Sequence, residues 1–137
     1  MNLQCAHLLK IKRRDGEDRG MDMKLLIVED NAAVRRVIRE MVADLADEIL
    51  ECIDGADAFE AYTQFHPDWV LMDVAMKRVN GIAATSQIKE AFPEANIVIV
   101  TNHDDSSLRE AATRAGASGY VLKEDMLALR EIILRTN

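Results

Sequence analysis

Apolar residues along this chain gather in five short runs, which are separated by segments of helical period. The runs fall at residues 24–29, 48–53, 69–73, 96–101 and 118–122. Three of them contain four consecutive apolar residues instead of alternating apolar and polar positions, at 25–28, 69–72 and 97–100. A continuous apolar run is typical of a strand buried on both faces, as in a parallel sheet covered by helices on each side.

The segments between the runs show the spacing of amphipathic helices. The clearest stripe has apolar residues three or four positions apart, at Val34, Val37, Ile38, Met41, Val42 and Leu45. Similar stripes predict helices near residues 58–65, 82–92, 108–115 and 126–133, and Gly116 is placed to end the fourth. Five strand–helix units predict an α/β fold: a five-stranded parallel sheet, order 2-1-3-4-5, doubly wound (flavodoxin-like) with helices on both faces.

The first 22 residues lie outside this pattern. They are polar and are interrupted by Gly16 and Gly20, so we expect residues 1–22 to be a flexible N-terminal extension. Residues 23–137 are then one folded domain, since 137 residues is about one domain's length.

Composition and charge narrow the function classes. The chain is 49% hydrophobic and 30% charged, which excludes a disordered or low-complexity protein. Its net charge is −7, and residues 23–137 hold 12 basic and 20 acidic residues, so we expect no direct binding of nucleic acid. No apolar run approaches the roughly 18 residues of a membrane span, and the two cysteines have no metal-ligand spacing. We therefore expect a soluble, cytoplasmic protein without a membrane partner.

Charged and hydroxyl residues stand where four of the predicted strands end. Glu29 and Asp30 follow the first strand, Asp73 the third, Thr101 the fourth and Lys123 the fifth. In open α/β sheets, ligands bind beyond the carboxyl ends of the strands, at the point where the strand order reverses. The sequence therefore places three carboxylates, a hydroxyl and an ammonium group at one candidate site.

The charges of this cluster predict a cation and a phosphoryl group. Two carboxylates about 4 Å apart repel by roughly 4 kcal/mol at an effective dielectric near 20. Lys123 supplies one positive charge for three acids, so a hard cation such as Mg²⁺ fits the remainder. A metal-bound carboxylate near an ammonium and a hydroxyl group suits the oxygens of a phosphoryl group.

Residues 24–137 resemble the receiver domain of two-component response regulators. Four motifs carry the resemblance: Ile27-Val28-Glu29-Asp30-Asn31, Val70-Leu71-Met72-Asp73-Val74-Ala75-Met76 with Gly81 after it, Val100-Thr101, and Gly119-Tyr120-Val121-Leu122-Lys123. The segment from residue 102 to residue 117 is most similar to receivers that usually precede a LuxR-type helix-turn-helix domain.

The resemblance implies a role for each acid of the cluster. Asp73 would be the phospho-acceptor, receiving a phosphoryl group from a histidine kinase or a phosphotransfer protein. Asp30, Asp73 and the backbone carbonyl of Ala75 would hold Mg²⁺, with Glu29 helping through water, and Lys123 would contact the phosphoryl oxygens. The chain would be no enzyme beyond its own phosphoryl transfer and dephosphorylation.

The resemblance also implies a switch. The Thr101 hydroxyl would contact the phosphoryl group, and Tyr120 would change rotamer with it. The reshaped surface, formed by the fourth helix, the fifth strand and the fifth helix, would bind a downstream protein target or form a homodimer.

Three positions depart from the usual receiver pattern. Lys77 stands where receivers commonly have Pro, Asn102 where a small residue follows the switch Thr or Ser, and Glu124 where many receivers have Pro. We expect these changes to affect loop geometry, access to Asp73 and the effective charge of Lys123, and to leave the chemistry in place.

Three other functions share parts of this pattern. A haloacid-dehalogenase type phosphohydrolase needs a second Asp two residues after the nucleophile, where this chain has Ala75. A flavodoxin-like carrier needs a phosphate-binding first loop, and an acidic loop at 29–31 would repel FMN phosphate. A receiver-like protein-interaction module that works without phosphorylation stays open as an alternative.

Since the chain stops at Asn137, we expect either a stand-alone receiver or a fragment of a longer regulator.

Overall fold

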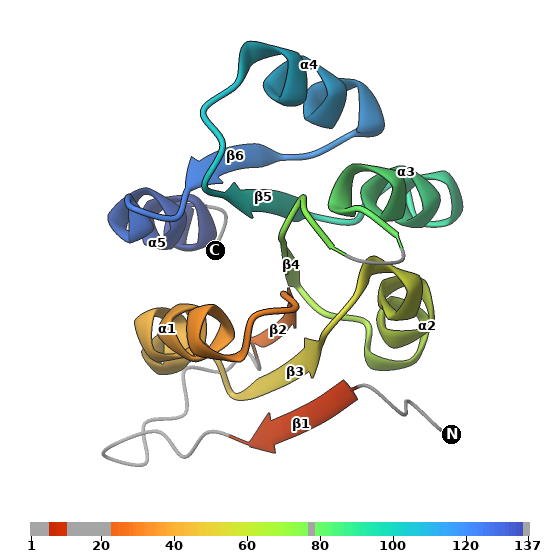
Figure 1. The fold of residues 1–137 in the computed structure, drawn as a ribbon. Coiled ribbons are helices and arrows are strands. Elements are labelled where there is room, and N and C mark those ends of the chain that lie inside the picture. The colour runs from red at the N-terminus through yellow and green to blue at the C-terminus, as the bar shows by residue number, and fades with distance from the viewer. Residues whose placement is uncertain (1–5, 11–22, 77–78, 136–137) are drawn as a thin grey trace.

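The structure of the protein is a computed structural model, and it describes residues 6–10, 23–76 and 79–135 (Figure 1). The strands are β1 (Ala6–Lys10), β2 (Lys24–Val28), β3 (Glu48–Cys52), β4 (Trp69–Met72), β5 (Ile97–Thr101) and β6 (Gly119–Leu122). The helices are α1 (Ala32–Val42), α2 (Gly55–Phe65), α3 (Gly81–Ala91), α4 (Ser106–Ala115) and α5 (Met126–Arg135), with a 3₁₀ turn at Ala43–Leu45.

The strands from β2 to β6 confirm the predicted parallel sheet. Their order is β3-β2-β4-β5-β6, which is 2-1-3-4-5 when these five strands are counted along the chain. All four pairings among them are parallel. Each strand starts within one residue of its predicted position.

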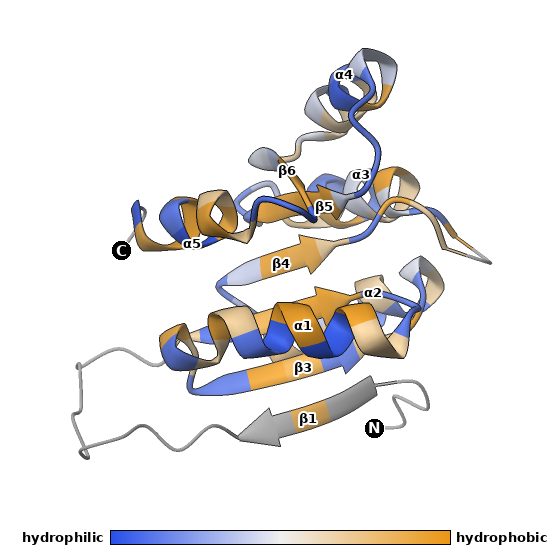
Figure 2. Ribbon diagram, turned by 60° about the vertical axis from the view of Figure 1, so that its left-hand side comes forward, coloured by the Kyte–Doolittle hydropathy of each residue, from blue (hydrophilic) through white to orange (hydrophobic). Residues whose placement is uncertain are grey.

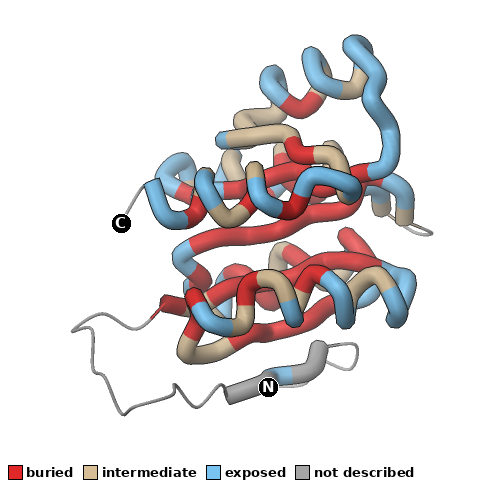
Figure 3. Tube along the Cα trace, turned by 90° about the vertical axis from the view of Figure 1, so that its left-hand side faces the viewer, coloured by how far each residue is buried: buried red, intermediate tan, exposed pale blue. Residues whose placement is uncertain are grey.

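The sheet has a hydrophobic core on each face. Leu25 and Ile27 of β2 belong to the core on the side of α1 and α5. Leu26 and Val28 belong to the core on the side of α2, α3 and α4. Figure 3 shows the central strands buried along their length, and Figure 2 shows them hydrophobic while α1 carries both hydrophobic and hydrophilic residues. The continuous apolar runs are thus explained by burial on both faces.

Four helices start with an N-cap side chain at the edge of the sheet where the parallel strands end. Asn31, Asp54, Asn80 and Asp105 precede α1, α2, α3 and α4, and each accepts a hydrogen bond from a backbone N–H of the first turn. These N-caps satisfy donors that a helix start otherwise leaves free. Gly116 ends α4 with φ +100°, the left-handed conformation that favours glycine, as predicted.

The N-terminal segment contains a strand that the sequence did not predict. Residues 6–10 form β1, which pairs antiparallel with β3 through residues 48–52 and makes the sheet six-stranded and mixed. Without β1, β3 would be an edge strand with a row of unpaired backbone groups, and pairing with β1 satisfies them. The other residues of the 1–22 segment lie outside the described part of the chain.

No helix in the part of the chain that the structure describes is long and apolar enough to cross a membrane.

Candidate functional site

The acidic residues of the site follow the ends of two adjacent strands. Glu29 and Asp30 come directly after β2, and Asp73 comes directly after β4. β2 and β4 are hydrogen-bonded neighbours, and the pairing continues past β4, because the Asp73 N–H donates to the Val28 carbonyl at 2.9 Å. Parallel pairing therefore carries the acids to one edge of the sheet, as the sequence predicts.

The three carboxylates form a compact cluster. One carboxylate oxygen from each of Glu29, Asp30 and Asp73 lies within 4.8 Å of the others. Glu29 and Asp73 are buried, with 1% and 5% of their surface exposed, whereas Asp30 is exposed. At such separations each pair of charges repels by at least about 3.5 kcal/mol at an effective dielectric near 20. The cluster therefore requires positive charge.

Lys123 supplies part of that charge. It follows β6, and its N–H donates to the Thr101 carbonyl at 2.8 Å, which carries the pairing of β5 and β6 one residue beyond the strand. Its Nζ lies 2.8 Å from Oε1 of Glu29 and 3.3 Å from Oδ1 of Asp73. Burial alone would lower the pKa of Lys123, but the contacts with Glu29 and Asp73 outweigh it and raise the pKa, so the ammonium stays charged.

The pKa values of the two buried carboxyl groups are also raised, which for an acid favours the neutral form. Burial raises the pKa of Glu29, although Lys123 and the Asn31 N–H, which donates to Oε2 at 3.1 Å, lower it in part. Burial also raises the pKa of Asp73; Lys123 opposes that rise and the charge of Asp30 adds to it. A single ammonium group therefore leaves the cluster under-neutralised.

The loop after Asp73 is held close to the strand by backbone contacts. The Gly81 N–H donates to the Val74 carbonyl at 2.9 Å, and a Cβ added to Gly81 would lie 1.8 Å from the Asp73 carbonyl oxygen. Asp54, at the start of α2, accepts a hydrogen bond from the Val79 N–H at 3.1 Å. Ala75 lies in this loop, two residues beyond Asp73, and is exposed. Lys77 is outside the described residues.

The two predicted switch residues are linked through one backbone segment. Thr101 is fully buried, and its hydroxyl accepts a hydrogen bond from the His103 N–H at 3.2 Å. The Tyr120 hydroxyl donates to the His103 carbonyl. The Arg109 guanidinium lies 4.5 Å from the centroid of the Tyr120 ring and pairs with Asp104 at 3.2 Å. A displacement of this segment would therefore act on both side chains.

The two other positions that depart from the receiver pattern, Asn102 and Glu124, lie on the surface near the site. Asn102 and Glu124 are exposed. A hollow of about 270 Å³ is lined by residues of α1, of the loops after β5 and β6 and of the start of α5: Ala33, Val34, Val37, Asn102, Lys123 and Met126. Asn102 thus borders an open surface beside Lys123, and its expected effect on access to Asp73 stays a prediction.

Sequence reasoning missed a buried ionic group next to the site. Glu51 of β3 is only 4% exposed and pairs with Arg35 and Arg39 of α1. Helical spacing alone assigns these arginines to a solvent-facing side. The available signal was Glu51 itself, since a carboxylate inside an apolar strand needs a charged or hydrogen-bonding partner.

The geometry fits a hard divalent cation and a phosphoryl group. Oxygen-only ligands with a net negative charge are what Mg²⁺ takes in proteins, usually with waters and phosphate oxygens. The buried Asp73 carboxylate, beside an ammonium and at the edge of the sheet, fits a nucleophile toward phosphorus.

Comparison with known proteins agrees with this geometry. The family model "Response regulator receiver domain" matches residues 25–134. The chain is 32% identical over 114 residues to the transcriptional regulatory protein DegU of Brevibacillus brevis, covering 81% of this chain and 48% of DegU. It is 35% identical over 103 residues to the chemotaxis protein CheY of Halobacterium salinarum, covering 75% of this chain and 86% of CheY. The chain thus spans about half the length of DegU and most of CheY.

Solved structures show the same fold. The crystal structure of a LuxR-family two-component response regulator from Aurantimonas sp. SI85-9A1 superposes with a TM-score of 0.75 at 31% identity. The match covers 84% of this chain and 87% of that chain.

Proposed function

This chain belongs to the family of response regulator receiver domains of two-component systems, and we propose that within it the chain is a working phosphoryl acceptor. Asp73 would accept a phosphoryl group from a histidine kinase or a phosphotransfer protein in the cytoplasm. The observation that carries the proposal is the buried Asp73 carboxylate, placed with two further acids and within 3.3 Å of the Lys123 ammonium. The chain would act as an acceptor and not as an enzyme on other substrates.

In the proposed transfer, an oxygen of the Asp73 carboxylate attacks phosphorus of a phosphohistidine. The P–O bond to Asp73 forms while the P–N bond breaks, and the leaving imidazole keeps the electron pair and takes a proton from solvent. Lys123 compensates negative charge on the phosphoryl oxygens, and it stays protonated for this role because Glu29 and Asp73 raise its pKa. The Thr101 hydroxyl would donate a hydrogen bond to one phosphoryl oxygen.

The residues present fit Mg²⁺ as the cofactor. Asp30, Asp73 and the Ala75 carbonyl would hold the ion, and Glu29 would assist through water. When bound, the ion would neutralise charge on the carboxylates and on the incoming phosphoryl oxygens. The clustered carboxylate oxygens and the incomplete compensation by Lys123 support this part of the proposal.

The proposed output is a change of the surface formed by α4, β6 and α5. His103 supports this proposal, because its backbone contacts both the Thr101 hydroxyl and the Tyr120 hydroxyl. Movement of Thr101 toward a phosphoryl group would break the first contact and release the segment that holds the second. The surface would then bind a downstream protein or a second copy of the chain, and the acidic domain would not itself bind nucleic acid.

Incorporation of phosphate tests the proposal. The purified chain, with Mg²⁺ and either a partner kinase or acetyl phosphate, is expected to gain the mass of one phosphoryl group. Asp73→Asn removes the nucleophilic oxygen and is expected to abolish the gain. A variant that still takes up stable phosphate at wild-type stoichiometry would refute Asp73 as acceptor. A folded wild-type chain that takes up none would favour the phosphorylation-independent interaction module.

A further inference from the structure

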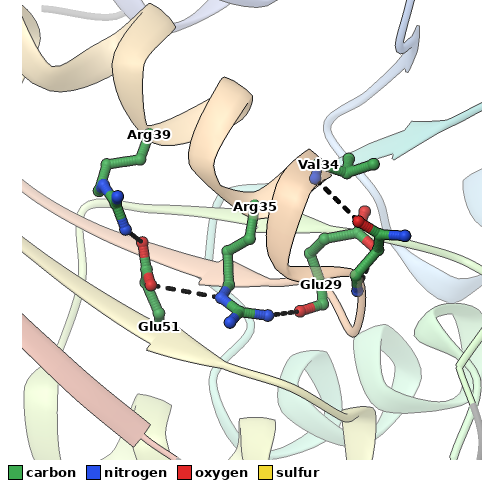
Figure 4. Close-up of polar contacts among 6 residues, drawn as sticks. Glu29, Val34, Arg35, Arg39 and Glu51 are labelled. Atoms are coloured by element: carbon green, nitrogen blue, oxygen red, sulfur yellow. Dashed lines mark hydrogen bonds and ion pairs between the residues drawn. The ribbon is translucent and has the colours of Figure 1, made fainter.

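We propose that Arg35 is a positioning residue for the metal-binding turn at Glu29 and Asp30, anchored through the buried Glu51. The inference deepens the proposed function, because it concerns how the same site is held ready for its cation. It rests on a chain of contacts between β3, α1 and the end of β2 (Figure 4).

The anchor of this chain of contacts is Glu51. The Glu51 side chain is 5% exposed, and its carboxylate accepts hydrogen bonds from Arg35 Nε at 3.3 Å and from Arg39 Nη1 at 2.9 Å. A buried carboxylate shared by two guanidinium groups is compensated and fixes both of them in place. The Arg35 side chain is itself only 18% exposed.

Arg35 differs from Arg39 in a second contact. Its Nη1 donates to the backbone carbonyl of Glu29 at 2.8 Å, so one planar group spans β3 and the turn that carries the acids. Because Nε and Nη1 point in fixed directions of a rigid fork, the position of Glu51 determines where the Glu29 carbonyl lies. A lysine ammonium carries its three donors on a single nitrogen, so it could not reproduce the separate positions of Nε and Nη1.

The contact of Arg35 with the Glu29 carbonyl also restricts the position of Asp30. The Glu29 N–H donates to the Cys52 carbonyl at 3.0 Å, so both backbone polar groups of Glu29 are tied to β3, one directly and one through Arg35. The Glu29 carbonyl belongs to the peptide group that joins Glu29 to Asp30. Holding this planar group in place also holds the backbone nitrogen and the Cα atom of Asp30. Groups that orient metal ligands in this way typically contribute 10–100-fold to metal affinity.

Arg39 provides a matched control. It lies one helical turn further along α1 and pairs with the same carboxylate, and its described contacts do not include Glu29. Arg35→Met and Arg39→Met each remove one guanidinium from Glu51 and keep a long helix-compatible side chain. Only Arg35→Met also releases the Glu29 carbonyl.

The test compares wild type, Arg35→Met, Arg35→Lys and Arg39→Met by three measurements. Calorimetric titration gives the Mg²⁺ dissociation constant, and urea unfolding in metal-free buffer gives stability. Backbone amide NMR of the metal-free protein reports on Asp30 and Asn31. We expect Arg35→Met to weaken Mg²⁺ binding about tenfold and to shift both amides. Arg35→Lys should recover less than half of the loss, and Arg39→Met should stay within about twofold of wild type despite a similar loss of stability.

Two results would overturn the inference: unchanged amides and Mg²⁺ affinity in Arg35→Met, or equal effects of Arg35→Met and Arg39→Met. The second would show that Glu51 only attaches α1 to the sheet. Failure of the proposed function has a different signature, because a wild-type chain that binds no Mg²⁺ and takes up no phosphate refutes the acceptor role. The metal-free amide shifts still decide whether Arg35 positions the turn in that case.

Discussion

At the scale of single residues, two carboxyl groups of the site are buried, and burial disfavours their ionised form. Glu29 and Asp73 are nearly inaccessible, and burial raises the pKa of both. An acid whose pKa is higher in the folded than in the unfolded state costs stability; the cost grows as the pH rises past the unfolded pKa and is complete above the folded pKa. The cost disappears as the pH falls to the unfolded pKa. Burial of these carboxylates therefore lowers stability, while it leaves negative charge available for the proposed cation site.

Asp73→Asn is expected to stabilise the metal-free protein near neutral pH. Asparagine keeps the shape of the side chain and removes a buried charge, so the free energy of unfolding should rise by about 1 kcal/mol, the size common for single stabilising changes. Below the unfolded pKa of an aspartate, about pH 4, both chains carry a neutral group and the gain should vanish. Urea unfolding with a chelator, at both pH values, measures the difference.

An exposed carboxylate serves as the control for this comparison. Glu110→Gln on α4 removes the same charge from an exposed position and should change stability by less than about 0.5 kcal/mol. If Asp73→Asn were instead less stable than wild type near neutral pH, the pairing of Asp73 with Lys123 would outweigh the cost of its burial.

At the scale of elements, the position of Asp73 depends on how closely α3 approaches the end of β4. Gly81, the first residue of α3, has room for no side chain, because an added Cβ would lie 1.8 Å from the Asp73 carbonyl oxygen. A Cβ on Gly55, the first residue of α2, would lie 2.4 Å from the Val79 carbonyl oxygen of the same loop. Two helix starts therefore confine the loop between Asp73 and α3.

Gly81→Ala is expected to destabilise the fold and impair the site together. The methyl group must displace the backbone of Asp73, so we expect a loss of about 2–3 kcal/mol and a phosphate uptake reduced well below wild type. Gly116→Ala is the control: its φ of +100° makes alanine strained, with a cost of about 1 kcal/mol, but it lies at the end of α4. Urea unfolding and intact-mass analysis measure both effects. Normal phosphate uptake by Gly81→Ala would show that the loop adapts without moving Asp73.

The elements also show what could be predicted from the sequence. The parallel strands were predictable, because burial on both faces leaves continuous apolar runs such as 25–28, and the acids at their ends follow from parallel pairing. β1 was not predictable from the sequence. This five-residue strand forms by pairing with the edge of β3, and that pairing depends on the tertiary fold. The contact of Arg35 with Glu51 was missed for a similar reason: spacing along α1 does not show which charge the neighbouring strand presents.

At the scale of the whole molecule, the sheet order separates the N-terminal strand from the proposed output surface. β1 and β6 lie at opposite edges of the sheet, with four strands between them (Figure 1). β1 pairs with β3 alone, whereas the acids follow β2 and β4. β1 should therefore contribute to stability without contributing to the chemistry.

A chain that begins at Met21 tests this separation. It lacks β1 but keeps Met23, which is buried in the core and whose N–H donates to Asp47 at 2.6 Å. Five cross-strand pairs are lost, so we expect a fall of about 1–3 kcal/mol in the free energy of unfolding. Amide hydrogen exchange should become faster for the β3 groups that bond to β1, while β4 and β5 amides keep their protection. Mg²⁺ affinity and phosphate uptake should match those of the full chain, since β3 remains paired with β2 and Glu51 stays on it. A folded truncated chain that takes up no phosphate would instead show that the added strand holds β3, and through Glu51 and Arg35 the metal-binding turn, in its working position.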